Sequence, residues 1–292
     1  FTPMVGAFGG SMIDISGSSA VRINALDMEK GYADDGKDPL PDKSEFVLSL
    51  FEQIMQDDLK AQHRSIIDRC VQAVYRPYIA SGYKGDAPTL TNLQAEIKRQ
   101  PEPEAQELAL AAELFISGSL SQKTNVDQNN RLTSYNILDL GEQLLPMGML
   151  VVLESIYNRV IQNWRAGRRT WVFVDEFSIF FRYPFATNFF LRMWKQVRKR
   201  AGYMTGITQN VGEMLTSKDA CWMLANSEFL IMLSQSASDR AALAELLNIS
   251  DTQLSYVENA DPGCGLMKFG GAFIPFVNSF PEDTELYKLM TT

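Results

Sequence analysis

The chain has 292 residues, 46% of them hydrophobic and 21% charged, and this composition is typical of a globular protein rather than of a disordered or collagen-like chain. Its formal net charge of -8 argues against broad nonspecific coating of DNA, although it is compatible with a local basic groove. Three cysteines lie far apart without a C-x-x-C pair, which fits a reducing compartment and excludes a disulfide framework or a zinc-finger pattern.

The first residues, Phe1-Thr-Pro-Met-Val-Gly, contain neither an initiator Met nor a signal-peptide pattern, so we expect a cut or incomplete chain. Apolar runs such as 147–153 are far shorter than the roughly 20 residues that a membrane-spanning helix needs. We therefore expect any membrane association to come through partners or through parts that this sequence does not include.

The first half of the chain predicts one short strand followed by a helical block. Residues 11–16 alternate in polarity and end at a Gly/Ser turn, which is typical of a strand. Apolar residues then recur every three or four positions over 43–80, which predicts two amphipathic helices. Pro88-Thr-Leu-Thr91 offers an N-cap for a shorter helix through Lys98, and another helix over 103–117 completes a block over about 40–120 with little strand character.

The second half predicts strands that alternate with helices. We expect strands at 134–139, 170–175, 203–208 and 228–234, helices at 142–165, 186–201, 210–216 and 238–247, and a C-terminal hairpin that turns at Gly270-Gly271. Helical crossovers between successive strands imply a mostly parallel sheet that is covered on both faces.

Two carboxylates follow the strand predicted at 170–175, whose residues Trp171 to Val174 we expect to be buried. Ligands of a parallel α/β sheet gather at the carboxyl ends of its strands, which is where Asp175 and Glu176 stand. An apolar strand that ends in Asp-Glu is typical of a Walker B motif: the Asp holds Mg²⁺ through water and the Glu orients or polarises the attacking water. The alternative is a strand that ends at the solvent edge with two solvated acids.

Polar and basic residues near the next strand add to this pattern. That strand runs to Thr208 and ends in Gln209-Asn210, and Gln209 is placed to sense a γ-phosphate or to position water, although such residues also form turns. Arg198-Lys199-Arg200 precedes the strand. A cluster of cations is favoured at a helix C-terminus by the dipole alone, and an arginine here is also suited to reach the phosphates of a neighbouring subunit.

One part of a nucleotide site is missing from the sequence. No segment matches the phosphate-binding loop G-x-x-x-x-G-K-[ST], and the glycines of 6–11 have no lysine after them and are more typical of a turn. We therefore expect this chain by itself to bind nucleotide poorly or not at all, and to be inactive alone.

Several long motifs, in order, resemble the C-terminal motor domain of the VirB-four (TraC/TraE-like) ATPases of type IV secretion and conjugation. They are "TWVFVDEF", "WKQVRKRAGYMTGITQNVGEML", "NSEFLIMLSQSASDRAAL", "LSYVENADPGCGLMKFGG" and "IPFVNSFPEDTELYKLMTT", with upstream segments such as "GGSMIDISGSSAVRINALDM". The resemblance covers nearly the whole chain. It implies an α/β, RecA-like fold of the P-loop NTPase (FtsK/HerA) type, with a mostly parallel sheet flanked by helices, an all-helical insertion and a C-terminal hairpin.

The resemblance also assigns roles by position. Asp175 corresponds to the Walker B Asp that holds Mg²⁺ through water, Glu176 to the catalytic Glu and Gln209 to the polar sensor, while Thr208 joins Asp175 as a cofactor-binding residue. Arg198 and Arg200 lie in the family's basic motif, and Arg240 falls in a further motif that faces the nucleotide or a subunit interface. The implied cofactors are ATP and Mg²⁺. Which arginine acts in trans stays open, and Ser178 stands where the family commonly has an aromatic residue or His.

The resemblance divides the chain into three parts: residues 1–40 begin the motor domain, 41–125 form the all-helical insertion, and 126–292 complete the motor domain. The family carries its phosphate-binding loop about forty residues before the point where this chain begins, after a separate N-terminal domain. The implied full-length protein is a hexameric ATPase at the cytoplasmic face of the inner membrane. Its implied partners are the coupling protein, channel and inner-membrane subunits of a type IV secretion system, with DNA as a further partner.

Two other functions remain open at this point. The first is a DNA translocase or helicase of the FtsK/HerA kind, which predicts a basic pore and turnover stimulated by DNA. The second is a noncatalytic docking module that keeps the fold and binds partners. The presence of Asp175, Glu176 and Gln209 argues against the second function.

Overall fold

The computed structural model describes residues 2–16, 20–33, 37–116, 122–126, 130–137, 140–142 and 144–291, apart from the side chains of residues 57, 114 and 115. The chain forms two compact units. The first unit comprises Phe1–Thr170 with Arg200–Gly202, and the second comprises Trp171–Lys199 with Tyr203–Thr292. In the described residues no helix is long and apolar enough to cross a membrane.

The elements up to residue 165 are α1 (Thr2–Ala7), β1 (Ser11–Asp14), α2 (Leu40–Met55), the 3-10 helix η1 (Gln56–Asp58), α3 (Ala61–Ala80), α4 (Leu90–Ile97), α5 (Pro103–Ile116), β2 (Thr133–Asn136) and α6 (Leu145–Arg165). The later elements are β3 (Thr170–Val174), η2 (Phe177–Arg182), α7 (Pro184–Gln196), η3 (Val197–Arg200), β4 (Gly202–Gly206), α8 (Val211–Leu215), α9 (Lys218–Ala225), β5 (Phe229–Met232), α10 (Ala237–Leu247), α11 (Asp251–Leu254), η4 (Ser255–Val257), β6 (Cys264–Phe269), β7 (Ala272–Val277) and α12 (Glu285–Met290).

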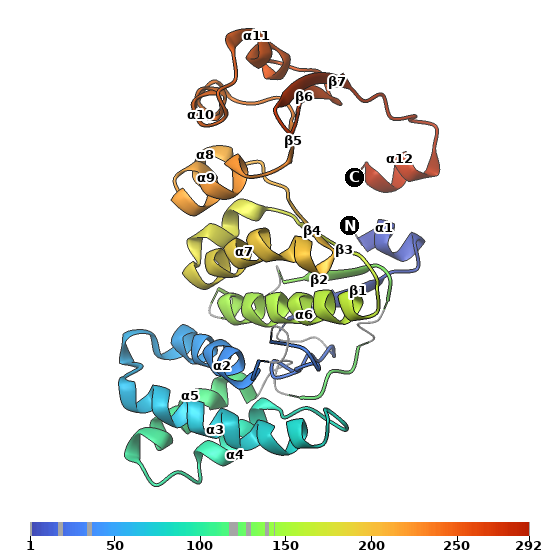
Figure 1. Ribbon diagram of the computed structural model, residues 1–292. Helices are drawn as coiled ribbons and strands as arrows, with labels where there is room; N and C mark the ends of the chain where they lie inside the picture. The colour runs from blue at the N-terminus through green and yellow to red at the C-terminus, as the bar shows by residue number, and fades with distance from the viewer. Residues whose placement is uncertain are drawn as a thin grey trace. The chain divides into compact units, whose positions relative to one another are not determined.

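The predicted helical block is confirmed as the four helices α2 to α5, which pack on one another in the first unit (Figure 1). The side chain of Thr89 accepts a hydrogen bond from the backbone N–H of Asn92 and so caps the start of α4, as the sequence of this segment predicts. Residue 117, the last of the helix predicted at 103–117, lies outside the described residues. The division at 41 and 125 into an insertion and a motor domain stays a prediction.

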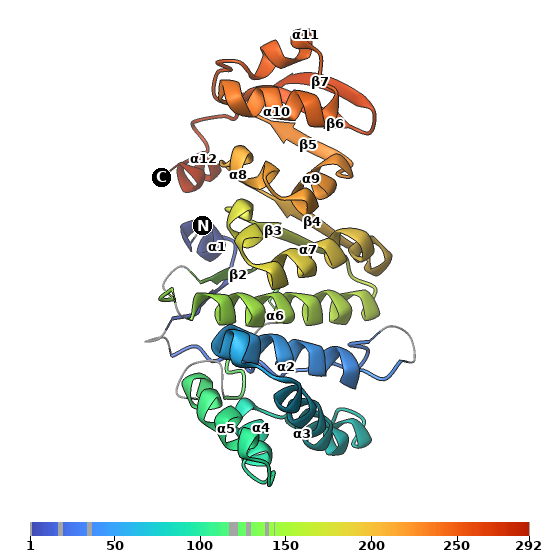
Figure 2. The same ribbon diagram turned by 90° about the vertical axis from the view of Figure 1, so that its left-hand side faces the viewer.

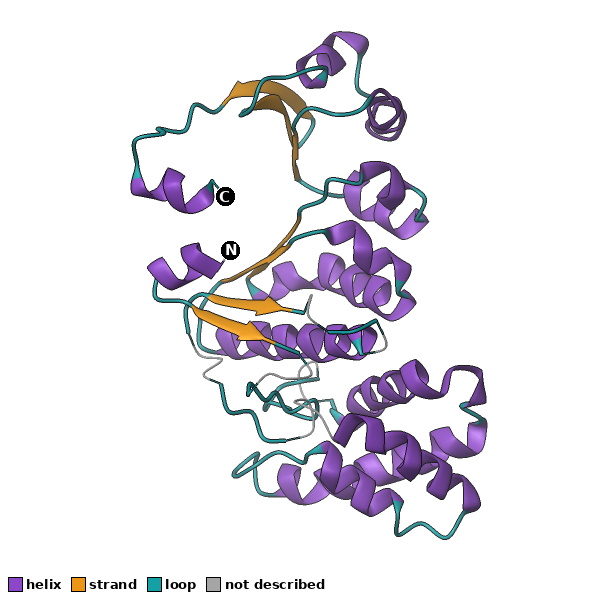
Figure 3. Cartoon of the chain, turned by 180° about the vertical axis from the view of Figure 1, so that it is seen from behind, coloured by secondary structure: helices purple, strands orange, loops and turns teal. Residues whose placement is uncertain are grey.

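The first unit also contains one parallel strand pair. In β1 and β2, Ser11 pairs with Thr133 and Asp14 with Asn136, so the two strands run in the same direction (Figure 3). These strands confirm the predictions at 11–16 and 134–139 in part, since residues 138 and 139 lie outside the described residues. The helix expected at 142–165 is confirmed as α6, which begins at Leu145 and buries most of its length.

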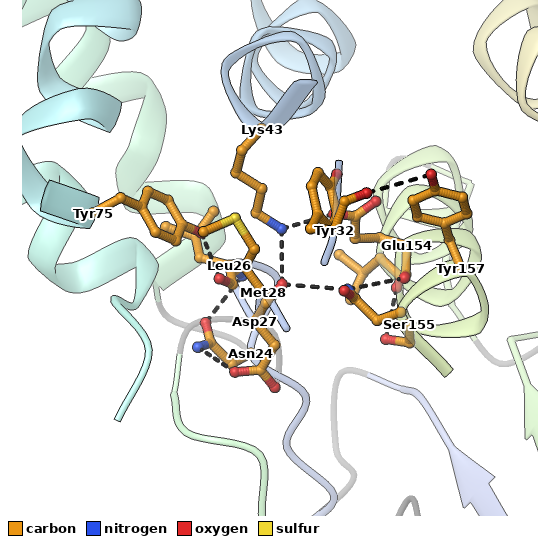
Figure 4. A network of polar contacts seen from close by, with 12 residues as sticks. Asn24, Leu26, Asp27, Met28, Tyr32, Lys43, Tyr75, Glu154, Ser155 and Tyr157 are labelled. Atoms are coloured by element: carbon orange, nitrogen blue, oxygen red, sulfur yellow. Dashed lines mark hydrogen bonds and ion pairs between the residues drawn. The ribbon is translucent and has the colours of Figure 1, made fainter. Parts of the chain in front are cut away.

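A buried polar network joins the helical block to α6 (Figure 4). The ammonium group of Lys43 in α2 lies 2.7 Å from the Glu154 carboxylate in α6, and the two side chains are 0% and 6% exposed. Lys43 also donates to the carbonyl of Asp27, and Asn158 of α6 donates to the same carbonyl. The hydroxyl of Tyr75 in α3 donates to the carbonyl of Leu26. The segment around Asp27 is therefore held from three helices at once.

Most of the parallel pair of β3 and β4 lies in the second unit, with α7 beside it (Figure 2). The backbone N–H of Thr170 donates to the Ala201 carbonyl, and the backbone N–H of Ile207 donates to the Val174 carbonyl. Residue numbers thus increase in the same direction along both segments, so the two strands are parallel. We expected Trp171 to Val174 to be buried, and this prediction is wrong for half of the strand. Val172 and Val174 are buried, but Trp171 is 55% and Phe173 66% exposed, because one face of β3 is uncovered in the structure described.

The remaining strands form a separate antiparallel sheet in the order β5-β6-β7, with α10 and α11 on one side (Figure 2). The predicted hairpin is confirmed: Phe269 pairs with Ala272 across a turn at Gly270-Gly271, and Gly270 has φ +56°. The expected single, mostly parallel sheet covered on both faces is not what the described strands form. They form two parallel pairs and this antiparallel sheet. The strand β5 pairs with β6 of the hairpin and therefore does not extend either parallel pair.

Candidate functional site

The ends of β3 and β4 bring a carboxylate and an amide side chain into contact within the second unit. The amide nitrogen Nε2 of Gln209 donates to the carboxylate oxygen Oε1 of Glu176 at 3.1 Å. The two residues are 33 positions apart in sequence. Both follow their strands at the carboxyl end, and the parallel direction of β3 and β4 explains why they meet.

The turn after β3 has an uncommon backbone. Glu176 adopts a left-handed conformation with φ 48° and ψ 45°, which costs a residue with a side chain about 1 kcal/mol or more. Its N–H donates to the Oδ1 atom of Asp175, and the N–H of Phe177 donates to the Ile207 carbonyl at 2.8 Å. The backbone ladder between the two strands therefore resumes immediately after Asp175-Glu176, and these two residues project from it.

The segments that follow the two strands are tied together by an ion pair. The guanidinium of Arg182 in η2 donates to the Glu213 carboxylate in α8 at 2.6 Å. This hydrogen bond lowers the pKa of Glu213 and raises the pKa of Arg182. Both groups face solvent, so we assign the pair a modest energy. Just before α8, the hydroxyl of Thr208 accepts a hydrogen bond from the backbone N–H of Asn210.

The basic motif lies at the other end of the strands. Arg198 and Lys199 precede β4, whereas Asp175 follows β3, and a five-residue strand is about 16 Å long. Arg198 and Lys199 are exposed. Arg200 is buried, and its guanidinium lies 5.2 Å from the centre of the Tyr157 ring. Arg198 and Asp175 are therefore not brought together within one chain.

Arg240 has partners of its own in the second unit. Its guanidinium donates to the Glu258 carboxylate at 2.7 Å and to the carbonyl of Gln235 at 3.2 Å. Its neighbour Asp239 approaches Gly212 of α8, where an added Cβ would lie 3.0 Å from the Asp239 carboxylate. Helix α10 thus packs against the helix that follows Gln209, while Arg240 is engaged with Glu258 in the structure described.

The residues present fit part of a Mg²⁺-nucleotide site. Asp175 is an exposed carboxylate at a strand end, which suits a Mg²⁺ ion that keeps most of its waters and takes one or two carboxylates. The described residues include no cluster of three or more Asp, Glu, His or Cys that could hold a metal by itself.

Sequence reasoning missed two features of this site. One is the Arg182–Glu213 pair, since charges 31 residues apart give no signal in the sequence. The other is the contact between Gly206 and Phe177, where a Cβ added to the glycine would lie 2.4 Å from the ring. A glycine inside a strand is a known sign of close approach, so the "MTGITQN" segment carried this second signal.

Comparisons with known proteins give matches at the level of structure. No protein-family model matches the chain, and a comparison with curated proteins finds no match. VirB4 of Thermoanaerobacter pseudethanolicus superimposes with a TM-score of 0.74 at 21% identity, over 95% of this chain and 79% of that one.

Structures of the bacterial conjugative coupling protein TrwB also match. Its trigonal form in complex with sulphate has a TM-score of 0.50 at 12% identity, over 94% of this chain and 75% of that one. A form in complex with the non-hydrolysable GTP analogue GDPNP has a TM-score of 0.44 at 13% identity, over 97% and 82%. The chain therefore has the mixed α/β fold of VirB4 of T. pseudethanolicus, and the resemblance that its motifs indicate is confirmed at the level of the fold.

Proposed function

We propose that this chain is the C-terminal motor region of a type IV secretion or conjugative transfer ATPase, which hydrolyses ATP to drive channel or pilus assembly and the transfer of DNA or protein. The observation that carries the proposal is the contact between Glu176 and Gln209 at the carboxyl ends of two parallel strands. The VirB4 fold supports it.

Each site residue has one role in this proposal. Asp175 holds Mg²⁺ through water, and the ion when bound neutralises charge on the phosphates. Glu176 orients and polarises the attacking water, and Gln209 fixes the Glu176 carboxylate and positions that water. Thr208 lies beside them at the nucleotide. The loop that cradles the phosphates comes from outside these 292 residues.

Of the three arginines that the resemblance offers, the exposed Arg198 is the best candidate to act on a neighbouring subunit, because Arg240 is engaged with Glu258. Arg198 is exposed, whereas Arg200 is buried beside Tyr157. Arg198 precedes its strand and Asp175 follows the neighbouring strand, so the two residues lie at opposite ends of the strand pair. We therefore assign Arg198 to the nucleotide of a second subunit in a ring. The proposal therefore includes a hexamer, located at the cytoplasmic face of the inner membrane through other secretion components.

Substitution of the proposed catalytic carboxylate tests the function. In the product of the complete reading frame, Glu176→Gln keeps the size of the side chain but removes its charge. We expect ATP turnover to fall by about 100-fold or more while nucleotide binding is retained. A matched control is Glu245→Gln, which removes an exposed carboxylate of α10 in the same unit and for which we expect the wild-type turnover.

Three results would contradict parts of the proposal. Hydrolysis by Glu176→Gln at the wild-type rate would overturn the catalytic assignment. No hydrolysis by the wild-type protein, together with no binding of ATP, would favour a docking module. Turnover that rises many-fold with double-stranded DNA would favour a DNA translocase.

A further inference from the structure

An aromatic side chain anchors the turn that carries the two carboxylates. Phe177, the residue after Glu176, is 2% exposed. Its ring centre lies 4.9 Å from that of Phe190, 5.0 Å from that of Phe181 and 5.5 Å from that of Trp194. Edge-to-face and stacked contacts on three sides leave the ring little freedom to move.

Gly206, the last residue of β4, also lies against this ring. A Cβ atom added to Gly206 would lie 2.4 Å from Cδ1, 2.8 Å from Cγ and 2.9 Å from Cε1 of Phe177. Its φ lies outside the left-handed range, so the glycine is needed for close approach and not for its own turn. The Phe177 ring therefore rests directly on the backbone of β4.

This contact bears on Glu176 because the intervening backbone is short and strained. A left-handed residue with a side chain persists only where its surroundings fix it on both sides. On one side, β3 ends at Val174, whose carbonyl accepts from Ile207 at 2.8 Å. On the other side, Phe177 donates to the Ile207 carbonyl and inserts its ring beside Gly206.

We infer that Phe177 and Gly206 are positioning residues for Glu176: the ring seated on the glycine holds the left-handed turn that directs the Glu176 carboxylate toward Gln209. Neither residue needs to touch nucleotide. The catalytic consequence rests on the proposed function, whereas the structural consequence does not.

Gly206→Ala tests this inference. The added methyl group displaces the Phe177 ring, which its three aromatic neighbours prevent from moving freely, so the turn shifts. In the product of the complete reading frame we expect kcat for ATP to fall by about 10- to 100-fold, with KM for ATP changed by less than about 2-fold. Gly271→Ala is the matched control, because a Cβ there meets no atom within 4 Å and its φ is not left-handed.

A second variant and a second readout separate positioning from general loss of structure. Phe177→Leu keeps an apolar side chain but loses the ring contacts, and we expect the same fall in kcat. Hydrogen exchange on the 292-residue chain reports the turn without any turnover. We expect the Phe177 amide to exchange at least about 10-fold faster in Gly206→Ala, while amides of β6 keep their protection.

The outcomes are distinguishable. An unchanged kcat in Gly206→Ala, or Phe177 exchange as slow as in the wild type, overturns the positioning role. Full hydrolysis by Glu176→Gln contradicts the proposed function instead, and the exchange measurement then decides the positioning role by itself. A loss of protection throughout the second unit indicates unfolding and also counts against the inference.

Discussion

Cys70 is a buried thiol in α3, and its surroundings disfavour the thiolate. Its pKa is raised from an ordinary value of 9.0 to about 11, chiefly by burial; the nearby charge of Glu96 adds to this rise and that of Arg69 opposes it. The folded protein therefore keeps this proton at a pH where the unfolded chain has lost it. The stability that Cys70 contributes is present below pH 9.0 and is lost as pH rises toward about 11.

This shift predicts an alkaline loss of stability that depends on one residue. We expect the free energy of unfolding of the wild type, minus that of Cys70→Ala, to decrease by about 2–3 kcal/mol between pH 9 and pH 11. The buried tyrosines titrate in both proteins and cancel in the difference. Urea denaturation at several pH values measures this difference in the free energy of unfolding. A difference independent of pH would show that burial does not shift the pKa of the Cys70 thiol.

Another residue whose environment matters is Ser178, which is fully buried two residues after the site. Its hydroxyl makes no hydrogen bond with the described part of the protein. The sequence resemblance leads us to expect an aromatic residue or His at this position. Because the Ser178 side chain is fully enclosed, a larger aromatic side chain here would displace its neighbours, so the small serine is consistent with the packing observed.

At the scale of elements, the Lys43–Glu154 pair fastens α2 to α6. Lys43 is enclosed by more than its ion pair, since its ammonium lies 5.1 Å from the Tyr32 ring centre and 4.6 Å from that of Phe46. Replacing one partner of a buried ion pair leaves the other charge buried without compensation, whereas replacing both partners by apolar residues leaves no buried charge.

This contrast predicts the result of a double-mutant cycle. We expect Lys43→Met to lower the free energy of unfolding by about 3–5 kcal/mol, and Lys43→Met/Glu154→Met to recover most of that loss. The control is Lys98→Met, whose exposed partner Glu113 lies 3.7 Å away, and we expect a loss below about 1 kcal/mol. Chemical denaturation measures all of them. A double variant as unstable as Lys43→Met would contradict this account of the pair.

At the scale of the whole molecule, the second unit exposes an unusual amount of apolar surface on its strands. Trp171 stacks on Tyr203 at 5.0 Å across β3 and β4, and Phe229 meets Phe269 across β5 and β6, yet all four side chains are exposed. Exposed apolar patches on a protein mark contact surfaces or sites of aggregation.

The uncovered face of β3 predicts a measurable change in dye binding. We expect Phe173→Glu to reduce the fluorescence of a bound hydrophobic dye such as ANS and to leave the melting temperature nearly unchanged, because Phe173 is already exposed. Leu110→Glu is the control, since Leu110 is equally exposed but lies on a helix of the other unit. Equal dye binding by the wild type and Phe173→Glu would show that this face does not bind apolar ligands.

Much of the local structure followed from the sequence. Periodicity located α2 and α3, a capping Thr located the start of α4, and a Gly-Gly pair located the hairpin turn. Helix α9 was missed, although Ser217 caps it, because its eight residues give too little periodicity to distinguish from a loop. The residues at the strand ends were also identified, since an apolar run that stops at two acids is a local signal.

The sequence by itself determined the helical block, the alternation that follows it and the places of Asp175, Glu176 and Gln209 after their strands, because these depend on neighbours within a few residues. Only the tertiary structure decided that β5 pairs with the hairpin, that Arg200 is buried while Arg198 is exposed, and that Lys43 meets Glu154. It also decided that the Phe177 ring lies against Gly206. These contacts join residues distant in the chain, and such pairings are set by packing and burial rather than by local pattern.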